Sequence, residues 1–194
     1  MGERRLWVFG YGSLLWNPGF EHDDREIARL CGYARSFCMW SIHHRGTRER
    51  PGLVLALDAQ RGACCDGLAF RVVPGGEAAA LAGLRERELI SAAYLEKTVT
   101  VRLADGRRVD AVTFVVDPGH AQYCADLSAE RQAQVIARAR GGRGPNAEYL
   151  HNTVEHLRAL GIRDDALERL AHRVRQIAGA APGQSAVGTG ALKE

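Results

Sequence analysis

Strand-like and helix-like segments are largely separated along this chain of 194 residues, with Pro118 between them. Short runs rich in β-branched and aromatic residues precede Pro118, as is typical of strands. They cover residues 6–9, 36–43, 52–58, 66–73, 97–103 and 109–116. Asp105 and Gly106, between the last two runs, are typical of a hairpin turn. Strands first and helices last predict an α+β fold, a strongly bent sheet or barrel with helices to one side.

Helices are expected once among the strands and three times after Pro118. Their ranges are 76–92, 128–141, 146–161 and 164–179. Ser128 has the side chain of an N-cap, and Asp164 and Asp165 stand at the start of the last helix, where the helix dipole favours negative charge. We expect residues 1–178 to form one domain and the small, polar residues 179–194 to form a flexible tail.

Composition excludes several classes of protein. Hydrophobic residues make up 46% and charged residues 25% of the chain, and no apolar stretch approaches the ~20 residues of a membrane span. The net charge of +3 comes from interspersed acids and bases, which argues against a nucleic-acid-binding arm. The N-terminus has no signal-peptide pattern. We therefore expect a cytoplasmic protein that binds a small molecule, with no membrane or nucleic-acid partner; the pattern does not indicate the oligomeric state.

Cysteines and histidines give no sign of a metal site. The five cysteines form no CxxC pair, so we expect reduced, structural thiols. His43 and His44 are adjacent and would point to opposite faces of a strand. His151 and His156 lie five apart, which fits a helical ligand pair poorly. We expect neither a metal nor a cofactor.

A glycine-containing loop follows the first strand in "WVFGYGSLLWNPGF". Leu15 stands where a dinucleotide-binding fingerprint needs its third glycine, and Ser13 lacks the flanking glycines of a nucleophile elbow. What remains is a tight loop in which Gly10 and Gly12 let backbone N–H groups point at a ligand carboxylate or an oxyanion. From these residues alone, a purely structural turn is the alternative.

Glu88 is the acidic residue expected to face inward on helix 76–92. At about 100° per residue, Leu81, Leu84 and Glu88 share a face, whereas Glu86 lies on the opposite side. A carboxyl group on an apolar face should have a raised pKa, so that it can take and return a proton near neutral pH. The alternative is a salt-bridged or partly exposed glutamate near a helix end.

Arg45 lies in the polar loop "HHRGTRERPG", where its guanidinium could hold a carboxylate through a bidentate pair. An ordinary surface loop is the alternative.

Several blocks, in order, resemble the ChaC-like branch of the γ-glutamylcyclotransferases. "FGYGSLLWNPGF" resembles the YGSL loop of that family, and "GYARSF" followed by "HHRGTRERPG" resembles its second block. "RERELISAAY" is similar to the block that bears its acidic residue, and "GPNAEYL" to a late block. The resemblance spans residues 6–176. It implies a small mixed β-barrel with flanking helices, and it makes residues 1–178 the catalytic domain.

Carried over residue by residue, the resemblance implies that Glu88 is the proton-transferring glutamate. The implied substrate-binding residues are Gly10, Tyr11, Gly12, Ser13, Leu14, Leu15, Arg45, Tyr94 and Tyr149. The implied reaction cleaves glutathione to 5-oxoproline and cysteinylglycine, with no metal or cofactor. Two alternatives stay open: a cyclotransferase acting on other γ-glutamyl amino acids or amines, and a non-enzymatic accessory protein of a cation transporter.

Overall fold

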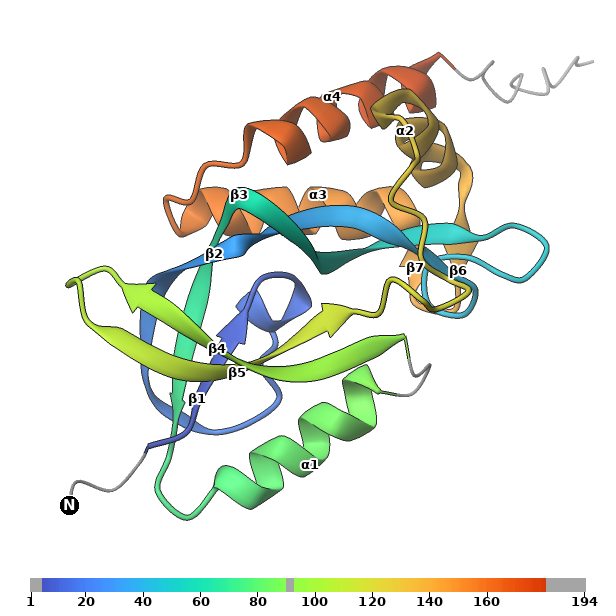
Figure 1. Cartoon of the computed structure of the whole chain (residues 1–194). Coiled ribbons are helices and arrows are strands. Elements are labelled where there is room, and N and C mark those ends of the chain that lie inside the picture. The colour runs from blue at the N-terminus through green and yellow to red at the C-terminus, as the bar shows by residue number, and fades with distance from the viewer. Residues whose placement is uncertain (1–4, 90–92, 181–194) are drawn as a thin grey trace, which may run out of the picture.

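The structure is a computed structural model that describes residues 5–89 and 93–180. Within these residues, five strands close a barrel in the order β1-β3-β2-β4-β5 (Figure 1). Their bounds are β1 Trp7–Gly10, β2 His22–Ser41, β3 Gly52–Val72, β4 Tyr94–Leu103 and β5 Arg108–Val116. A separate short pair is formed by β6 Arg140–Gly141 and β7 Gly144–Pro145. Because β1 and β3 each pair with β5 in parallel and the other barrel pairs are antiparallel, the barrel is mixed, as predicted.

The two longest strands, β2 and β3, are longer than the sequence pattern predicted. Residues 22–35 were not expected to be strand, and 52–58 and 66–73 were expected as two strands rather than one. The first half of β2 alternates between exposed and less exposed positions and carries many charged residues, which hides it from a search for apolar runs. Register shifts along the β2–β3 pair, such as that between Cys31 and Tyr33, let these strands bend.

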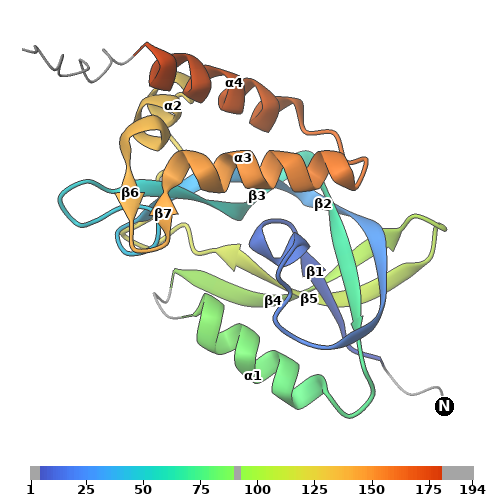
Figure 2. The ribbon, with the colours of Figure 1, turned by 180° about the vertical axis from the view of Figure 1, so that it is seen from behind.

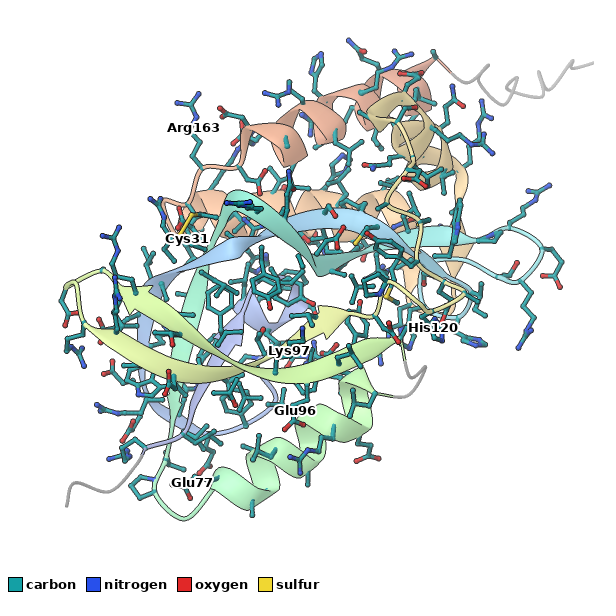
Figure 3. All side chains as sticks on the ribbon, viewed as in Figure 1. Cys31, Glu77, Glu96, Lys97, His120 and Arg163 are labelled. Atoms are coloured by element: carbon teal, nitrogen blue, oxygen red, sulfur yellow. A yellow bond between two sulfur atoms is a disulfide. The ribbon has the colours of Figure 1, made fainter. Side chains whose placement is uncertain are left out.

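The helices lie on two sides of the barrel rather than one. Helices α2 Ala129–Arg138, α3 Asn146–Ala159 and α4 Asp165–Gly179 gather over β2 and β3, whereas α1 Glu77–Glu88 lies on the opposite side (Figures 1 and 2). The expectation of helices to one side was therefore wrong for α1. Arg85 of α1 binds the Glu96 carboxylate of β4 through two hydrogen bonds of 2.6 and 2.8 Å, and Figure 3 labels Glu96 between these elements.

Ser128 caps α2 as predicted, and Asp164, expected at the start of the last helix for its charge, caps α4; α2 ends at Arg138, earlier than the predicted range 128–141. Ser128 accepts a hydrogen bond from the backbone N–H of Arg131, and Asp164 accepts one from that of Leu167. Helix α1 ends at Glu88, earlier than predicted, and residues 90–92 lie outside the described part. Of the expected tail 179–194, Gly179 is the last residue of α4, and residues 181–194 lie outside the described part.

Two of the five cysteines are not free thiols. Cys31 and Cys64 stand directly opposite each other on β2 and β3 and form a disulfide (Figure 3). The expectation of five reduced thiols was wrong for this pair, because strand register, which the sequence pattern does not reveal, brings the two side chains together. Cys38, Cys65 and Cys124 are free. Among the described helices, none is long and apolar enough to cross a membrane.

Candidate active site

A pocket of about 310 Å³ lies among the loop after β1, the end of α1, the loop between β2 and β3, and the turn between β6 and β7. Its volume is at the lower end of the range of small-molecule sites, roughly 300–1,000 Å³. Eight of the ten site residues expected from the sequence line it. These are Tyr11, Gly12, Ser13, Leu14, Arg45, Glu88, Tyr94 and Tyr149.

The other two expected residues, Gly10 and Leu15, do not line the pocket. A Cβ atom on Gly10 would lie 2.9 Å from the Cβ of Leu14 and 3.2 Å from the ring of Phe70. Only glycine therefore lets the loop fold back this closely on β1. Leu15 is buried in the core between the barrel and helices α2–α4. Both residues therefore pack the loop against the core and do not face the pocket.

The loop itself turns into a single 3-10 turn, η1 Ser13–Leu15. The N–H of Leu15 donates to the carbonyl of Gly12 at 2.9 Å. For Gly12, Ser13 and Leu14, no protein acceptor binds the backbone N–H in the part of the chain that the structure describes. Three N–H donors are therefore available to an anionic ligand at the pocket wall.

Glu88 is the last residue of α1 and faces the pocket. Leu84, one turn earlier, is buried, and Glu86 is exposed, so the helical phase predicted from the sequence is confirmed. The Glu88 side chain is 19% exposed. Burial raises the pKa of this carboxyl group, while the positive charges of Arg87 and Arg143 act in the opposite direction.

Three tyrosines surround the pocket side of Glu88. The Tyr11 hydroxyl donates to the carbonyl of Phe114 at 3.0 Å, and the Tyr94 hydroxyl donates to that of Leu55 at 3.1 Å. Burial, together with the negative charge of Glu88, raises the pKa of Tyr11 and Tyr94 well above 10 and that of Tyr149 to about 12. Their hydroxyl groups therefore remain neutral hydrogen-bond donors at neutral pH.

Arg87, which the sequence pattern did not single out, connects Glu88 to the loop. Its Nη2 donates to Ser13 Oγ at 2.5 Å, its Nη1 to the carbonyl of Asn17 at 2.7 Å, and its Nε lies 3.2 Å from Glu88 Oε1. Adjacent residues of a helix point about 100° apart, so helical periodicity gave no reason to place Arg87 beside the same pocket. Its contacts depend on how the loop docks on α1.

Arg45 occupies the opposite wall, where it joins two loops. Its Cζ lies 5.3 Å from the centre of the Tyr149 ring, and its Nη1 donates to the carbonyls of Arg143 and Pro145 at 2.6 and 3.2 Å. The backbone N–H of Arg143 also donates to the carbonyl of His44 at 2.9 Å. The Arg45 guanidinium is thus bound to backbone carbonyls, and it packs over one of the pocket tyrosines.

Two buried polar side chains hold the frame around the pocket. Asn146, at the start of α3, accepts a hydrogen bond from the N–H of Leu53 at 2.6 Å and donates one to its carbonyl at 2.7 Å. Arg35 of β2 donates to the carbonyl of Tyr11 at 2.9 Å and pairs with Asp164 at 3.0 Å. These contacts fix α3, α4 and the loop to the barrel. Within the described residues, no group of three or more His, Cys, Asp or Glu side chains could hold a metal ion.

Comparison with known proteins identifies a family. Residues 6–177 match the family described as ChaC-like protein. The chain is 38% identical to the glutathione-specific gamma-glutamylcyclotransferase of Escherichia coli (strain K12), over 90% of this chain and 75% of the relative. It is 32% identical to gamma-glutamylcyclotransferase 2-3 of Arabidopsis thaliana, over 89% of each chain.

Among solved structures, the gamma-glutamylcyclotransferase specific to glutathione from yeast has the same fold, with a TM-score of 0.82 at 21% identity. The similarity covers 93% of this chain and 100% of the yeast chain. Because the family match extends over most of the sequence, the chain belongs to the ChaC-like protein family.

Proposed function

We propose that this chain is a glutathione-specific γ-glutamylcyclotransferase, a lyase of glutathione catabolism that releases 5-oxoproline and cysteinylglycine. The observation that carries the proposal is the position of Glu88. Among the described residues that line the pocket, it is the one carboxylate, and it lies beside a loop with three available N–H donors. The names of the relatives, which specify glutathione, support the choice of substrate.

Ring closure begins at the α-amino group of the γ-glutamyl residue. This group is protonated at neutral pH and must lose a proton before its nitrogen can attack the γ-carbonyl carbon. Ionised Glu88 accepts that proton, and its raised pKa suits a group that takes and returns protons near neutrality. Because the attacking nitrogen and the carbonyl belong to one molecule, holding the folded conformer supplies much of the rate acceleration.

The tetrahedral intermediate then collapses with cleavage of the γ-amide bond. The attacking nitrogen gives up protons as it becomes the lactam nitrogen, and the departing nitrogen of cysteinylglycine gains them. Glu88 carries protons from the first nitrogen to the second, so no covalent bond to the enzyme forms. The backbone N–H groups of Gly12, Ser13 and Leu14 hold either the α-carboxylate of the substrate or the developing oxyanion. In other enzymes, removal of one oxyanion donor raises the activation free energy by about 3–4 kcal/mol.

The test of this function is product formation. Purified protein is incubated with millimolar glutathione in buffer that contains a chelator, and 5-oxoproline and cysteinylglycine are followed by mass spectrometry. We expect both products in equal amounts. γ-Glutamyl-alanine in a parallel reaction distinguishes a cyclotransferase of broader specificity, and no 5-oxoproline from any γ-glutamyl compound would contradict the proposal.

The reaction is proposed to take place in the cytoplasm, where glutathione is held in its reduced form. An accessory protein of a cation transporter, the non-enzymatic alternative, would co-sediment with membranes and would be indifferent to substitution of Glu88.

A further inference from the structure

Positive charge exceeds negative charge around the pocket. Among its described lining residues are three arginines, Arg45, Arg87 and Arg143, against the one carboxylate of Glu88. The guanidinium of Arg45 binds two backbone carbonyls, and that of Arg87 binds Ser13, the loop carbonyl and Glu88. Both guanidinium groups are therefore already bound to groups of the protein.

Arg143 differs from the other two. It is exposed at the pocket rim, on the turn between β6 and β7. No hydrogen bond or ion pair joins its guanidinium to any residue in the described ranges 5–89 and 93–180. A cation that lines a pocket and is not occupied by protein groups is available to an anionic part of a ligand.

The charge of glutathione matches this arrangement. At neutral pH it carries one ammonium group and two carboxylates. The ammonium group and one carboxylate share the α-carbon of the γ-glutamyl residue, so both lie at the reacting end, near Glu88 and the loop. The other carboxylate belongs to glycine and lies at the far end, beyond the nitrogen that departs. The far end therefore needs a separate cation, from another wall of the pocket than α1.

We propose that Arg143 binds the glycyl carboxylate of glutathione, and that this contact selects glutathione over γ-glutamyl compounds that lack a carboxylate at that position. The inference rests on the proposed function, and it assigns Arg143 a role in specificity rather than in proton transfer.

The backbone around Arg143 is held in place while the side chain is not. Its N–H donates to the carbonyl of His44 at 2.9 Å, and its carbonyl accepts from Arg45. A Cβ atom on Gly141 would lie 2.5 Å from the backbone N of Gly46, so a glycine is needed where the two loops meet. The anchored turn fixes the direction from which the Arg143 guanidinium reaches the rim.

The pKa of the neighbouring His44 is affected by the same excess of positive charge. Burial lowers the pKa of His44, and the positive charges of Arg143, His43, Arg45 and Arg87 lower it further. A carboxylate bound at the rim would offset this concentration of positive charge.

The inference is tested by pairing a change in the protein with a change in the substrate. Turnover of glutathione and of its glycyl ethyl ester, which lacks the glycyl charge, is measured with wild type, Arg143→Gln and Arg143→Lys. Arg140→Gln is the matched control, because Arg140 is exposed nearby on β6 and does not line the pocket. For wild type, esterification should lower kcat/KM by about tenfold, the loss expected for one charge-assisted contact.

The assays are run at a pH above the acidic limb of the pH profile, because Arg143 lowers the pKa of Glu88 and its loss would raise that pKa. There, Arg143→Gln should lower kcat/KM for glutathione by about the same tenfold through a higher KM, while kcat/KM for the ester stays near wild type. Arg143→Lys should retain part of the discrimination, and Arg140→Gln all of it. If Arg143→Gln prefers glutathione over the ester as strongly as wild type does, or if kcat/KM falls equally for both substrates, the role assigned to Arg143 is wrong, while the proposed function is unaffected. Absence of 5-oxoproline from every γ-glutamyl compound with wild type would instead overturn the proposed function, and this inference with it.

Discussion

Arg87 Nε lies 3.2 Å from Glu88 Oε1, and the remaining nitrogens of the same guanidinium bind the loop at Ser13 and Asn17. One side chain thus joins the candidate base to the candidate anion-binding loop. The distance between the two halves of the site is therefore set by α1 and the loop together. The same positive charge also opposes the effect of burial on the pKa of Glu88.

Arg87→Gln should move the acidic limb of the pH profile of kcat/KM to higher pH. The base must be ionised, so activity rises as pH rises through the pKa of Glu88, which burial raises above its ordinary value of about 4.3. Arg87 and Arg143 both lower this pKa, so removing Arg87 leaves it higher. Arg85→Gln, on the same helix but bound to Glu96, is the control and should not move the limb. A limb at or below the wild-type pH in Arg87→Gln would contradict the electrostatic account.

Glu88→Gln should be at least as stable as wild type at pH 8. A raised pKa in the folded state means that ionising Glu88 destabilises the fold. This cost is absent below the pKa of the unfolded chain, about 4.3, and develops as pH rises through the folded pKa. Urea unfolding at pH 4 and pH 8 measures the difference, which should favour the variant only at the higher pH. The prediction is contradicted if the free energy of unfolding of Glu88→Gln, compared with that of wild type, is lower at pH 8 than at pH 4.

Gly10→Ala should destabilise the protein by about 1–3 kcal/mol, the usual cost of overpacking a core. The added Cβ would lie 2.9 Å from the Cβ of Leu14 and displace the loop. Gly83→Ala provides the opposite control, because a Cβ there meets no atom within 4 Å and the residue lies inside α1. That change should stabilise the protein by roughly 0.5–1 kcal/mol. Denaturant unfolding gives the free energy of unfolding of both variants. Equal changes in Gly10→Ala and Gly83→Ala would argue against the close packing of the loop.

Asn146→Ala should cost about 1–3 kcal/mol, because it leaves the buried N–H and carbonyl of Leu53 without their partner. Asn152→Ala, on the same helix but without a side-chain hydrogen bond to the described residues, should cost less. The free energies of unfolding of the two variants are compared with that of wild type. Similar values for both would show that the Asn146 contacts contribute little.

The inner face of α1 could be predicted from the sequence because helical periodicity places Glu88 one turn after Leu84, whatever the rest of the fold. The N-cap Ser128 and the negative charge of Asp164 at the start of the last helix could also be predicted, because both act within one turn of their own helix. Glycines 10 and 12 could be assigned to a tight loop, yet their different tasks could not be distinguished. Gly10 allows close packing against Leu14, whereas Gly12 lines the pocket.

Features that depend on contacts between distant segments could not be predicted in this way. Arg87 of α1 contacts Ser13, which lies 74 residues earlier in the chain, and the guanidinium of Arg45 contacts carbonyls about 100 residues later. The pairing of Cys31 with Cys64 depends on the register of β2 against β3. The position of α1 across the barrel from α2–α4 depends on the closure of the sheet, which no local pattern encodes.

The most direct test of the account is the turnover of glutathione by Glu88→Gln and Glu86→Gln, measured as 5-oxoproline released by matched amounts of folded protein. Both substitutions remove one carboxylate from α1, but Glu88 faces the pocket and Glu86 is exposed. We expect Glu88→Gln to bind glutathione without turning it over, and Glu86→Gln to retain near wild-type activity. Near wild-type turnover by Glu88→Gln would contradict the assignment of the base and, with it, the proposed mechanism.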